Sequence, residues 1–435
     1  MIYYFIGIKG SGMSSLAQIM HGLGYEVMGS DKSEHFFTEV ELIKKGIKIV
    51  EFNAENIKEN MVIVQGNAFN DDQEEVVRAK ELGLKIYSYQ EMIAEITNDT
   101  KLIAISGCHG KTTTTTMVSK VLENVGVNYL IGDGTGYAKK GNEYFALEAC
   151  EWKRHFLAYN PYYSVITNIE LDHTDYYKDL DDVMDAFTSF VNKTRKSVIM
   201  CGDDINTRRI KTDKKITFYG FNDNNDVVAK NIKHDNEKTI ADIYIDGEFF
   251  DTYTFPFVGD HLLLNAMGVI TVCYLENIDK DEIRNQVAKI EHAKRRFIEE
   301  KFESNILIDD YAHHPTEVKV TIEAARKKYP DRELIAIFKA HTRSRVEHFY
   351  KEFADALNLA DKAYIMDIGV DRKEIGYDHI TYENILKYVK NGEHISIETA
   401  DKLLQYENAV LLFMSSKDIY VLANKYKELY NERKS

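Results

Sequence analysis

The sequence predicts a three-domain α/β protein. Short apolar strands alternate with helical segments along nearly the whole chain, which is typical of parallel sheets covered by helices. The length of 435 residues exceeds what one hydrophobic core usually supports. Two glycine-rich loops each stand between a strand and a helix, where α/β proteins bind phosphates. We therefore expect a Rossmann-like N-terminal domain, a central P-loop-type ATPase domain with a mixed sheet, and a Rossmann-like C-terminal domain.

The composition is that of a globular protein, and its charge argues against a nucleic-acid partner. Apolar residues make up 44% and charged residues 29%, and the formal net charge is −15. Because the chain has no long basic run, we expect no nucleic-acid partner. The four cysteines lie far apart and form no C-x-x-C pair, which favours a reduced, cytoplasmic protein.

Neither a signal peptide nor a membrane span is predicted. The N-terminus runs from a short apolar strand directly into glycines, without a charged segment or a long apolar stretch. No run of roughly 18 apolar residues is present, so we expect no membrane insertion. The sequence makes no prediction of oligomeric state.

The first predicted domain, residues 1–98, contains the first glycine loop. A polar patch, "ITNDT" at 96–100, marks its end. The expected elements are strands at 2–8, 25–31, 61–67 and 84–89 and a helix at 11–24.

The loop "GIKGSGMSSLA" resembles a dinucleotide fingerprint. Gly10 and Gly12 lie between the first strand and its helix, and Asp31 ends the next strand about 20 residues on. Ser15 stands where a third glycine or alanine is expected. The pattern is compatible with NAD, with the diphosphate of a UDP-sugar, or with a tight structural turn.

The second predicted domain, residues 99–294, contains the second loop and a change of pattern. Period-two alternation over 216–258 predicts an antiparallel addition to the sheet. The expected elements are strands at 101–106, 143–149, 162–169 and 197–203 and helices near 111–125, 180–193, 261–276 and 279–291.

The loop "GCHGKTTTT" has the character of an ATP-binding loop. The usual G-x-x-x-x-G-K-[ST] pattern would place a glycine at Ile105, whereas Gly107, Gly110, Lys111 and Thr112 fit their expected positions. Lys111 would reach the β/γ-phosphates, and the Thr112 hydroxyl would ligate Mg²⁺. A run of five threonines is a mediocre helix start, so a purely structural turn explains the segment poorly.

Further Mg²⁺ ligands are expected at the ends of later strands. Glu148 and Glu151 close one strand of this domain, while Asp172 and His173 follow the next. The carboxyl ends of parallel strands meet at one edge of the sheet. A metal site at this edge is therefore predicted.

The third predicted domain, residues 295–435, opens after "AKRRF" (293–297). The expected strands are 305–312, 333–338, 362–368 and 409–415, with helices between them. Asp309 and Asp310 admit two interpretations, as functional carboxylates or as N-caps of the next helix.

Taken together, the motifs resemble those of the ATP-dependent Mur ligases. The segments "GIKGSGMSSLA", "GCHGKTTTT", "LEACE", "TNIELDH", "GDHLLLNA", "KRRF" and "DDYAHHPTE" occur in the order found in that family and extend over nearly the whole chain. The resemblance is closest to ligases that join L-alanine to UDP-N-acetylmuramate in peptidoglycan precursor synthesis. The shorter phosphate loop is usual there, so Ile105 is no defect.

The resemblance implies ATP and Mg²⁺ as cofactors, UDP-N-acetylmuramate and L-alanine as substrates, and a role for each motif. It places Arg296, Lys111, His173 and His314 in catalysis, with His314 a possible base for the incoming ammonium group. The implied UDP-sugar-binding residues are Gly7, Gly10, Ser11, Gly12, Met13 and Asp31. The implied ATP-binding residues are Gly107, Cys108, His109, Gly110, Lys111, Thr112, Thr113, His261 and Asn265. The implied metal ligands are Thr112, Glu148 and His173, and the implied amino-acid-binding residues are Tyr311, His314 and Arg345, with Asp310 beside them.

Three segments of the third domain depart from the family pattern. They read "KAHTRSR" (339–345), "GVDRKEIGYD" (369–378) and "SSKD" (415–418), and Leu262 replaces a usual asparagine. Three functions therefore remain open: the L-alanine ligase, a sibling ligase that adds another amino acid or a peptide, and a catalytically weakened UDP-sugar-binding regulatory protein. Arg296 and Arg345 also admit the simpler interpretation of exposed surface charges.

Overall fold

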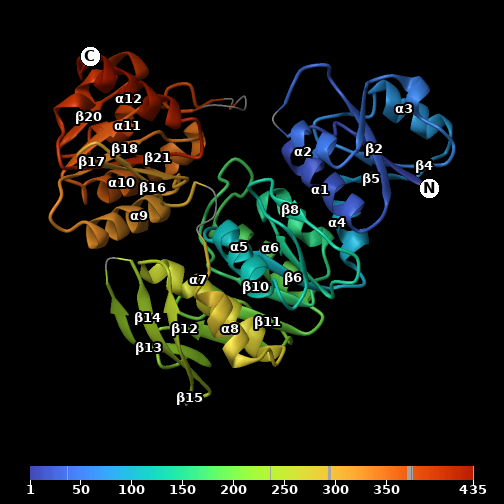
Figure 1. Cartoon of the computed structure of the whole chain (residues 1–435), viewed down its shortest axis with the longest axis horizontal. Coiled ribbons are helices and arrows are strands. Elements are labelled where there is room, and N and C mark those ends of the chain that lie inside the picture. Colours follow the sequence, from blue (N-terminus) through green and yellow to red (C-terminus); the bar gives the residue numbers. More distant parts are fainter. Residues whose placement is uncertain (37, 236, 292–294, 370–373, 375, 435) are drawn as a thin grey trace.

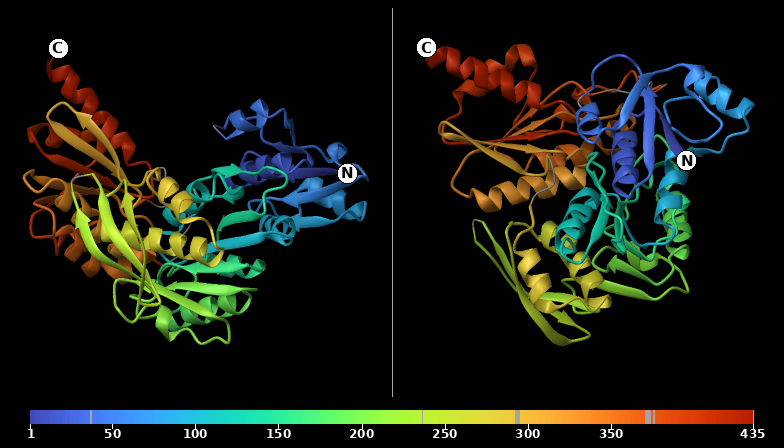
Figure 2. Two further views of the ribbon diagram at one scale, coloured as in Figure 1. Left: turned by 60° about the horizontal axis from the view of Figure 1, so that its bottom comes forward. Right: turned by 45° about the vertical axis from the view of Figure 1, so that its right-hand side comes forward.

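Three sheets, formed in succession by residues 2–88, 101–255 and 298–414, organise the molecule. The structure is a computed structural model that describes residues 1–36, 38–235, 237–291, 295–369, 374 and 376–434. In Figure 1 the C-terminal lobe lies at the upper left of the central lobe and the N-terminal lobe at its upper right, and Figure 2 shows the three lobes from two further directions. This arrangement confirms the predicted three-domain α/β class.

The N-terminal sheet is parallel, with strand order β3-β2-β1-β4-β5. Its strands are β1 (Ile2–Ile6), β2 (Glu26–Asp31), β3 (Lys48–Glu51), β4 (Met61–Gln65) and β5 (Ile86–Ser88). Its helices are α1 (Ser11–Gly22), α2 (Glu39–Lys44), η1 (Ala54–Asn56), α3 (Glu74–Glu81) and α4 (Tyr89–Thr97). The chain leaves β1 toward β2 on one side and later returns to β4 on the other. Such a reversal of strand order opens a crevice beyond the ends of the strands, beside the first glycine loop.

The central sheet is mixed, with order β15-β14-β13-β12-β11-β10-β6-β9-β7-β8. Its strands are β6 (Lys101–Ser106), β7 (Val127–Leu130), β8 (Gly136–Tyr137), β9 (Tyr144–Glu148), β10 (Tyr163–Ile166), β11 (Ser197–Cys201), β12 (Ile216–Gly220), β13 (Val227–His234), β14 (Thr239–Ile245) and β15 (Glu248–Phe255). Its helices are α5 (Lys111–Val121), η2 (Trp152–Ala158), α6 (Leu180–Asn192), η3 (Thr207–Arg209), α7 (Asp260–Leu275) and α8 (Lys280–Val287).

The period-two region is only partly antiparallel. Strands β13, β14 and β15 pair antiparallel to one another, as predicted. Strand β12 pairs parallel with both β11 and β13, so the parallel part of the sheet extends further than expected. Alternating hydrophobicity reports a half-exposed strand and does not distinguish the direction of its neighbour.

The C-terminal sheet has order β16-β17-β21-β18-β19-β20, parallel except for β16 against β17. Its strands are β16 (Ile298–Phe302), β17 (Asn305–Asp310), β18 (Leu334–Phe338), β19 (Lys362–Ile365), β20 (Gly392–His394) and β21 (Val410–Met414). Its helices are α9 (Pro315–Lys328), α10 (Arg343–Leu357), α11 (Glu383–Leu386), η4 (Ile397–Gln405) and α12 (Tyr420–Lys434). Apolar clusters on both faces of this sheet make up its core.

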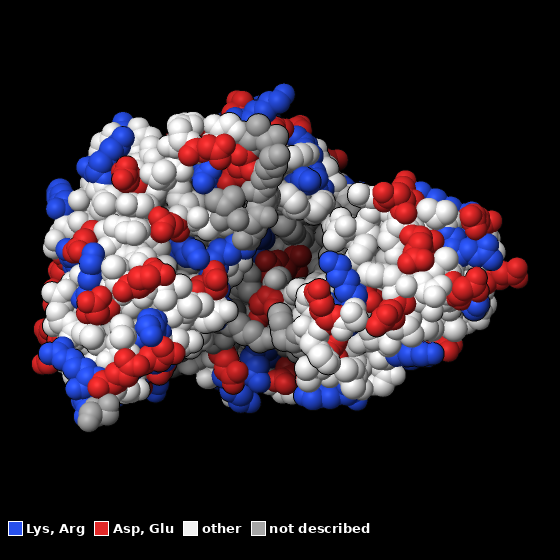
Figure 3. All heavy atoms as spheres, turned by 90° about the horizontal axis from the view of Figure 1, so that it is seen from above, with Lys and Arg blue, Asp and Glu red and all other residues white. Residues whose placement is uncertain are grey.

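The lobes contact one another directly. The Ser15 hydroxyl in α1 donates a hydrogen bond to the Gly134 carbonyl of the central lobe. A side chain added at Gly22 would meet the Ala138 carbonyl oxygen at 2.2 Å, so the two backbones pass very close together there. Figure 3 shows a hollow between the lobes, with acidic side chains inside it. Among the described residues, no helix is both long and apolar enough to span a membrane.

Candidate active site

The second glycine loop lies between β6 and α5, and its conformation requires glycine twice. Gly107 has a φ of 139° and Gly110 a φ of 83°, values that other residues rarely adopt. A Cβ atom at Gly107 would lie 2.1 Å from the Thr167 Oγ1 atom, and one at Gly110 would lie 2.7 Å from the Asn265 Oδ1 atom. The loop therefore leads its backbone tightly into the N-terminus of α5, where unpaired N–H groups favour an anion.

The segment that follows β10 fixes the same loop from the side. The His109 amide donates to the Asn168 Oδ1 atom at 2.9 Å. The His109 carbonyl accepts from the Asn168 side-chain amide at 2.9 Å and from the Thr167 hydroxyl at 2.5 Å. Neither supporting residue was predicted from the sequence, although both stand at the start of the "TNIELDH" motif.

Lys111 is held by a buried carboxylate. Its Nζ atom donates to the Glu151 Oε1 atom at 3.0 Å and to the Cys108 carbonyl at 3.1 Å. The side chain of Lys111 is 13% exposed and that of Glu151 only 1%. Burial opposes the charge on Lys111, but the Glu151 carboxylate raises the pKa of the ammonium group, so it stays protonated. A fixed positive charge is thus present where phosphates are expected.

The predicted metal ligands form two adjacent groups. The Thr112 hydroxyl donates to the Glu148 Oε1 atom at 3.1 Å, and the Gly132 amide donates to the Glu148 Oε2 atom at 2.7 Å. His173 instead pairs with Glu151, its Nε2 atom lying 3.3 Å from Oε1.

The donor set fits a hard divalent cation. The Glu151 Oε2 atom is buried and has no hydrogen-bond partner among the described residues. Ligand atoms of Glu151, Asp172 and His173 lie within 4.8 Å of one another. Burial raises the pKa of Glu148, a shift that a nearby cation would oppose. Carboxylate and hydroxyl oxygens are the ligands that Mg²⁺ prefers.

All three lobes contribute to one cavity of about 520 Å³ beside this loop. Ser11 comes from the N-terminal lobe, whereas Arg296 and Tyr311 come from the C-terminal lobe. The central lobe supplies Lys111, Thr112, Glu148 and His173 to the same cavity. The structure thus brings together predicted residues that are up to 300 positions apart in the sequence.

An adjoining cavity of about 310 Å³ lies on the other side of the loop. It is lined by His261 and Asn265 of α7 and by Gly110 and Thr113. Arg296 borders both cavities. A nucleotide placed with its phosphates at the loop would have room for its nucleoside here.

The predicted UDP-sugar-binding residues line a separate cavity of about 490 Å³ in the N-terminal lobe. These residues are Gly7, Gly10, Ser11, Gly12, Met13 and Asp31. Gly7 has a φ of 82°, and a Cβ atom there would collide with the Phe69 ring at 2.1 Å. The Asp31 carboxylate accepts from the Lys9 amide at 2.7 Å and so also holds the loop.

The two aspartates at the end of β17 do not cap α9. Asp310 is buried and accepts from the backbone amides of Phe297 and Ala312, both at 2.8 Å. Burial raises the pKa of Asp310 to about 6. Asp309 pairs with Arg295 at 3.1 Å. The interpretation of these residues as helix caps is therefore wrong.

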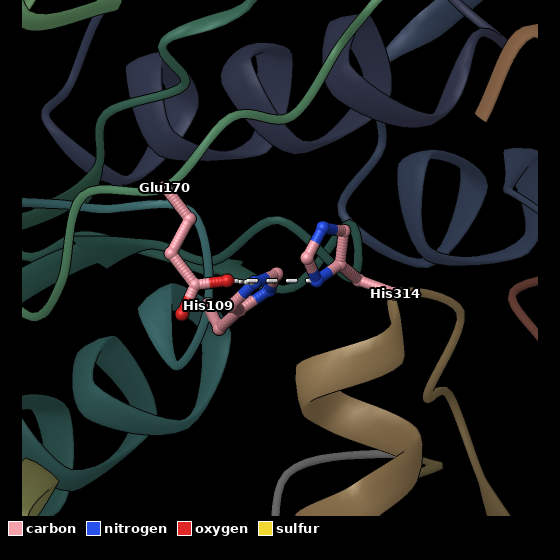
Figure 4. Close-up of side chains that lie close together, drawn as sticks. All are labelled: His109, Glu170 and His314. Atoms are coloured by element: carbon pink, nitrogen blue, oxygen red, sulfur yellow. Dashed lines mark ion pairs between the residues drawn. The ribbon is translucent and has the colours of Figure 1, made fainter. Parts of the chain in front are cut away.

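The N-cap of α9 is His314, whose Nδ1 atom accepts from the Thr316 amide at 3.4 Å. Its ring lies 4.5 Å from the ring of His109, between centroids. Glu170 points toward both rings (Figure 4). Burial, with the nearby charge of His109, lowers the pKa of His314 to about 3, so its imidazole is neutral at pH 7. Its role as a base stays a prediction.

The pKa of His109 shifts in the opposite direction to that of His314, because two carboxylates lie beside it. Burial would lower the pKa of His109, but pairing with Glu170 and Glu317 raises it to about 9. Burial likewise opposes ionisation of Glu170, yet contact with His109 lowers its pKa to about 2. Glu317 also lies 3.3 Å from the Arg296 guanidinium. Glu170 and Glu317 lie within the motifs "TNIELDH" and "DDYAHHPTE", but they were not predicted as site residues, because their pairing with His109 joins distant segments of the chain.

Arg345 is buried and engages a carboxylate of the central lobe. Its Nε and Nη2 atoms donate to the Asp172 Oδ1 atom at 3.0 and 2.7 Å. Both side chains are at most 6% exposed. Burial opposes the charge of Asp172, but Arg345 lowers its pKa well below the usual range. The interpretation of Arg345 as a surface charge is wrong, and Arg296 is likewise largely buried, with 20% of its side chain exposed.

The atypical C-terminal segments form a hydrogen-bonded turn beside β18 and β21. The Ser415 hydroxyl donates to the Lys339 carbonyl at 2.8 Å and accepts from the Lys417 amide at 3.0 Å. Lys339 pairs with Asp418 at 3.1 Å. In the third segment, 369–378, positions 370–373 and 375 lie outside the described residues, as does 294 at the expected domain boundary.

Comparison with known proteins identifies the fold and the family. Solved structures similar to this chain include the UDP-N-acetylmuramate-alanine ligase MurC of Thermotoga maritima, with a TM-score of 0.78, 24% identity and 100% of both chains covered. A murein peptide ligase from Psychrobacter arcticus matches with a TM-score of 0.69 and 22% identity over 99% of both chains. The MurF ligase of Thermotoga maritima in complex with ADP matches with a TM-score of 0.65 and 18% identity over 94% of this chain and 95% of the other.

Three family profiles cover most of the sequence in succession. Residues 2–101 match the Mur ligase family catalytic domain, and residues 105–273 match the Mur ligase middle domain. Residues 295–423 match the domain described as Mur ligase, glutamate ligase domain. The chain therefore belongs to the Mur ligase family of ATP-dependent ligases.

Proposed function

We propose that this protein joins L-alanine to the carboxylate of UDP-N-acetylmuramate, with conversion of ATP to ADP and phosphate. Residues 1–98 would bind the UDP-sugar, residues 99–294 would bind ATP, and residues 295–435 would bind the amino acid. The higher TM-score to the MurC structure, 0.78 against 0.69 for the murein peptide ligase, supports this choice within the family.

The observation that carries the proposal is the cavity shared by all three lobes. It joins the first glycine loop at Ser11 to the phosphate loop at Lys111 and to Arg296 and Tyr311 of the C-terminal lobe. A ligase that couples ATP to two further substrates needs such a meeting point, because the reacting atoms must come within bonding distance.

The chemistry requires activation of a carboxylate. A carboxylate oxygen attacks the γ-phosphorus of ATP, the bond to the β–γ bridging oxygen breaks, and ADP leaves. The uncharged amine of the amino acid then attacks the carbonyl carbon of the acyl phosphate. Collapse of the tetrahedral intermediate breaks the C–O bond, so that phosphate leaves and an amide forms.

The chain supplies fixed positive charge for both steps. Lys111 would stabilise charge on the transferred phosphoryl oxygens, and Arg296 would face the same region from the C-terminal lobe. Thr112, Glu148 and His173 would hold Mg²⁺, which neutralises phosphate charge when bound. His314 is the candidate acceptor for the proton of the ammonium group, and Arg345 the candidate partner of the amino-acid carboxylate.

A product assay tests this proposal. The purified protein is given ATP, Mg²⁺ and UDP-N-acetylmuramate with L-alanine, other amino acids or short peptides in parallel. We expect phosphate release and a UDP-sugar amide, detected by mass spectrometry, with L-alanine preferred. Product with a peptide instead would show a sibling ligase, and UDP-sugar binding without any product would favour a regulatory protein.

Variant Lys111→Ala provides the internal control. It should remove turnover and leave UDP-sugar binding intact, since the two sites lie in different lobes. Loss of both functions together would indicate misfolding.

A further inference from the structure

A second cluster of metal-ligating side chains lies outside the expected magnesium ligands. It consists of His109 in the phosphate loop, Glu170 after β10, and His314 at the start of α9. Figure 4 shows the three side chains converging from three separate segments. His314 belongs to the C-terminal lobe, whereas the other two residues belong to the central lobe.

The spacing of these side chains suits one small cation. The Glu170 Oε2 atom lies 3.4 Å from the His109 Nε2 atom and 3.7 Å from the His314 Nδ1 atom. One ligand atom from each residue lies within 4.8 Å of the other two. Donor atoms around a tetrahedral Zn²⁺ ion are roughly 3.3 Å apart, so small side-chain movements would complete a site.

The histidines have unused hydrogen-bonding capacity. Neither ring nitrogen of His109 has a hydrogen bond of normal geometry among the described residues, and the same holds for the His314 Nε2 atom. His314 is 3% exposed, so water does not readily replace a partner. Buried imidazoles are nearly always hydrogen-bonded or bound to a metal. The open nitrogens of His109 therefore leave room for a ligand between the rings, whereas the His314 Nδ1 atom that faces Glu170 already accepts a long hydrogen bond, of 3.4 Å, from the Thr316 amide.

Neighbouring side chains hold Glu170 and His109 in place. Metal-binding residues in other proteins are oriented by hydrogen bonds of the same kind. The Thr316 hydroxyl donates to the Glu170 Oε2 atom at 2.7 Å. The His109 Nδ1 atom lies 3.6 Å from the Glu317 Oε1 atom, so a carboxylate faces the far side of the ring. A metal-bound histidine typically has such a carboxylate on its other nitrogen.

From this geometry we propose that His109, Glu170 and His314 form a site for Zn²⁺ or a similar borderline transition-metal ion, distinct from the magnesium ligands. Two imidazoles and one carboxylate are a ligand set of catalytic and regulatory zinc sites and leave a fourth position open. Mg²⁺ strongly prefers oxygen ligands and keeps its waters, so it competes poorly here. A bound ion ties the C-terminal lobe to the phosphate loop. It also occupies His314, so His314 cannot accept the proton of the ammonium group while the ion is bound.

Stoichiometry is the direct test. Untagged, metal-free protein is titrated with Zn²⁺ by calorimetry, in buffer that holds excess Mg²⁺. We expect the wild type to bind one more tight Zn²⁺ ion than either His314→Asn or Glu170→Gln. In each variant the affinity of that site should fall by about tenfold or more.

Both variants preserve the local structure. Asparagine is a good N-cap and can still accept from the Thr316 amide. Glutamine can still accept from the Thr316 hydroxyl through its carbonyl oxygen. Because the two substitutions lie in different lobes, the same loss in both assigns the effect to the shared site rather than to local misfolding.

His173→Ala separates this site from the neighbouring Glu151–Asp172–His173 cluster. It should retain the tight Zn²⁺ ion. The proposal is overturned if the wild type binds no tight Zn²⁺, if the two cluster variants bind it as the wild type does, or if His173→Ala alone loses it. A rise in the thermal unfolding temperature with Zn²⁺, seen in the wild type and in His173→Ala only, is the second readout.

Discussion

Lys111 is held at the proposed phosphate-binding loop by an ion pair that is already formed in the folded chain. Glu151, 1% exposed, accepts from its Nζ atom. A buried carboxylate without a cation is costly, so the two residues stabilise each other as a pair rather than singly. A phosphate that arrives at the loop therefore meets a cation whose geometry is set in advance.

We predict that Lys111→Met abolishes turnover and lowers the free energy of unfolding by about 3 kcal/mol, because the buried Glu151 carboxylate loses its lysine partner and keeps only His173 beside it. The double variant Lys111→Met/Glu151→Gln should regain most of that stability while remaining inactive. Thermal unfolding and phosphate release measure the two effects separately. Full activity in the double variant would show that the charge of Lys111 is not needed for phosphoryl transfer.

Individual site residues were predictable where the motif is local. Gly107, Gly110 and Lys111 lie within five positions, and their spacing alone indicates a phosphate loop. The support from Asn168 and the pairing of Glu317 depend on contacts between distant segments, with 59 positions between His109 and Asn168. No spacing rule in a single sequence encodes such contacts.

At the scale of elements, the transition from β6 to α5 depends on the conformation of Gly110. Its φ of 83° lies in the left-handed region, and the space beside it is filled by Asn265 of α7. Gly110 thus allows the backbone turn at the start of α5 and leaves space for Asn265 of α7. An added side chain would disturb both.

We predict that Gly110→Ala weakens ATP binding by about tenfold, a loss of about 1.4 kcal/mol in binding free energy. The matched control is Gly141→Ala, at a φ of 97° with no atom within 4 Å of the added Cβ. Both variants should lose about 1 kcal/mol of stability through backbone strain. Calorimetric titration with ATP should separate them, and equal ATP affinity in the two would refute a role for the contact with Asn265.

One carboxylate at the C-terminus of α7 forms hydrogen bonds with side chains of the three neighbouring strands β6, β9 and β10. Glu276 accepts from Lys101 of β6 at 2.7 Å and from Lys196 at 3.1 Å. It also accepts from the hydroxyls of Tyr144 in β9 and Tyr163 in β10, at 2.8 and 2.6 Å. Burial opposes its ionisation, but these donors lower the pKa of Glu276 to about 2.

We predict that Glu276→Gln lowers the free energy of unfolding of the central domain by roughly 2 kcal/mol at pH 7. The folded pKa lies below the unfolded value of about 4.3, so the carboxylate stabilises the fold above that pH. Its contribution is lost as the pH falls from about 4.3 toward 2. Hydrogen exchange of β6, β9 and β10 in both proteins should show a difference that narrows below about pH 4.3.

Glu123→Gln is the control for that experiment. Glu123 is 58% exposed and pairs with Lys120 three positions earlier. Exposed pairs of this kind contribute little, so its removal should leave the exchange rates unchanged within error. A comparable loss in both variants would mean that the buried network adds nothing beyond general surface charge.

Elements were predictable where the pattern is strong and long. The buried strands of all three domains and helices such as α6 and α7 lie within a few residues of their predicted positions. Short strands at sheet edges, such as β3 and β20, were not predicted. Few residues in such strands are buried, so hydrophobicity gives them little signal, and their pairing is decided by the neighbouring strand.

At the scale of the whole molecule, the sequence indicated three domains but not how they meet. The central and C-terminal lobes are joined by the Arg345–Asp172 pair and by the Thr316–Glu170 hydrogen bond. These contacts link positions 146 or more residues apart. Arg345 was predicted to bind a substrate carboxylate, and in this arrangement it already binds one from the protein.

We predict that Asp172→Asn shifts the molecule toward a more open arrangement of its C-terminal lobe. Arg345 would stay buried without a charged partner in the closed form, at a cost of about 3 kcal/mol, which corresponds to roughly 100-fold in the equilibrium between open and closed forms. Small-angle scattering should give a larger radius of gyration for this variant than for the wild type, both without ligands. The matched control is Asp182→Asn, which removes a partner of Arg154 within the central lobe and should leave the radius unchanged. An unchanged radius in Asp172→Asn would mean that the ion pair does not hold the lobes together, and that Arg345 is free to exchange Asp172 for a substrate carboxylate without any domain motion.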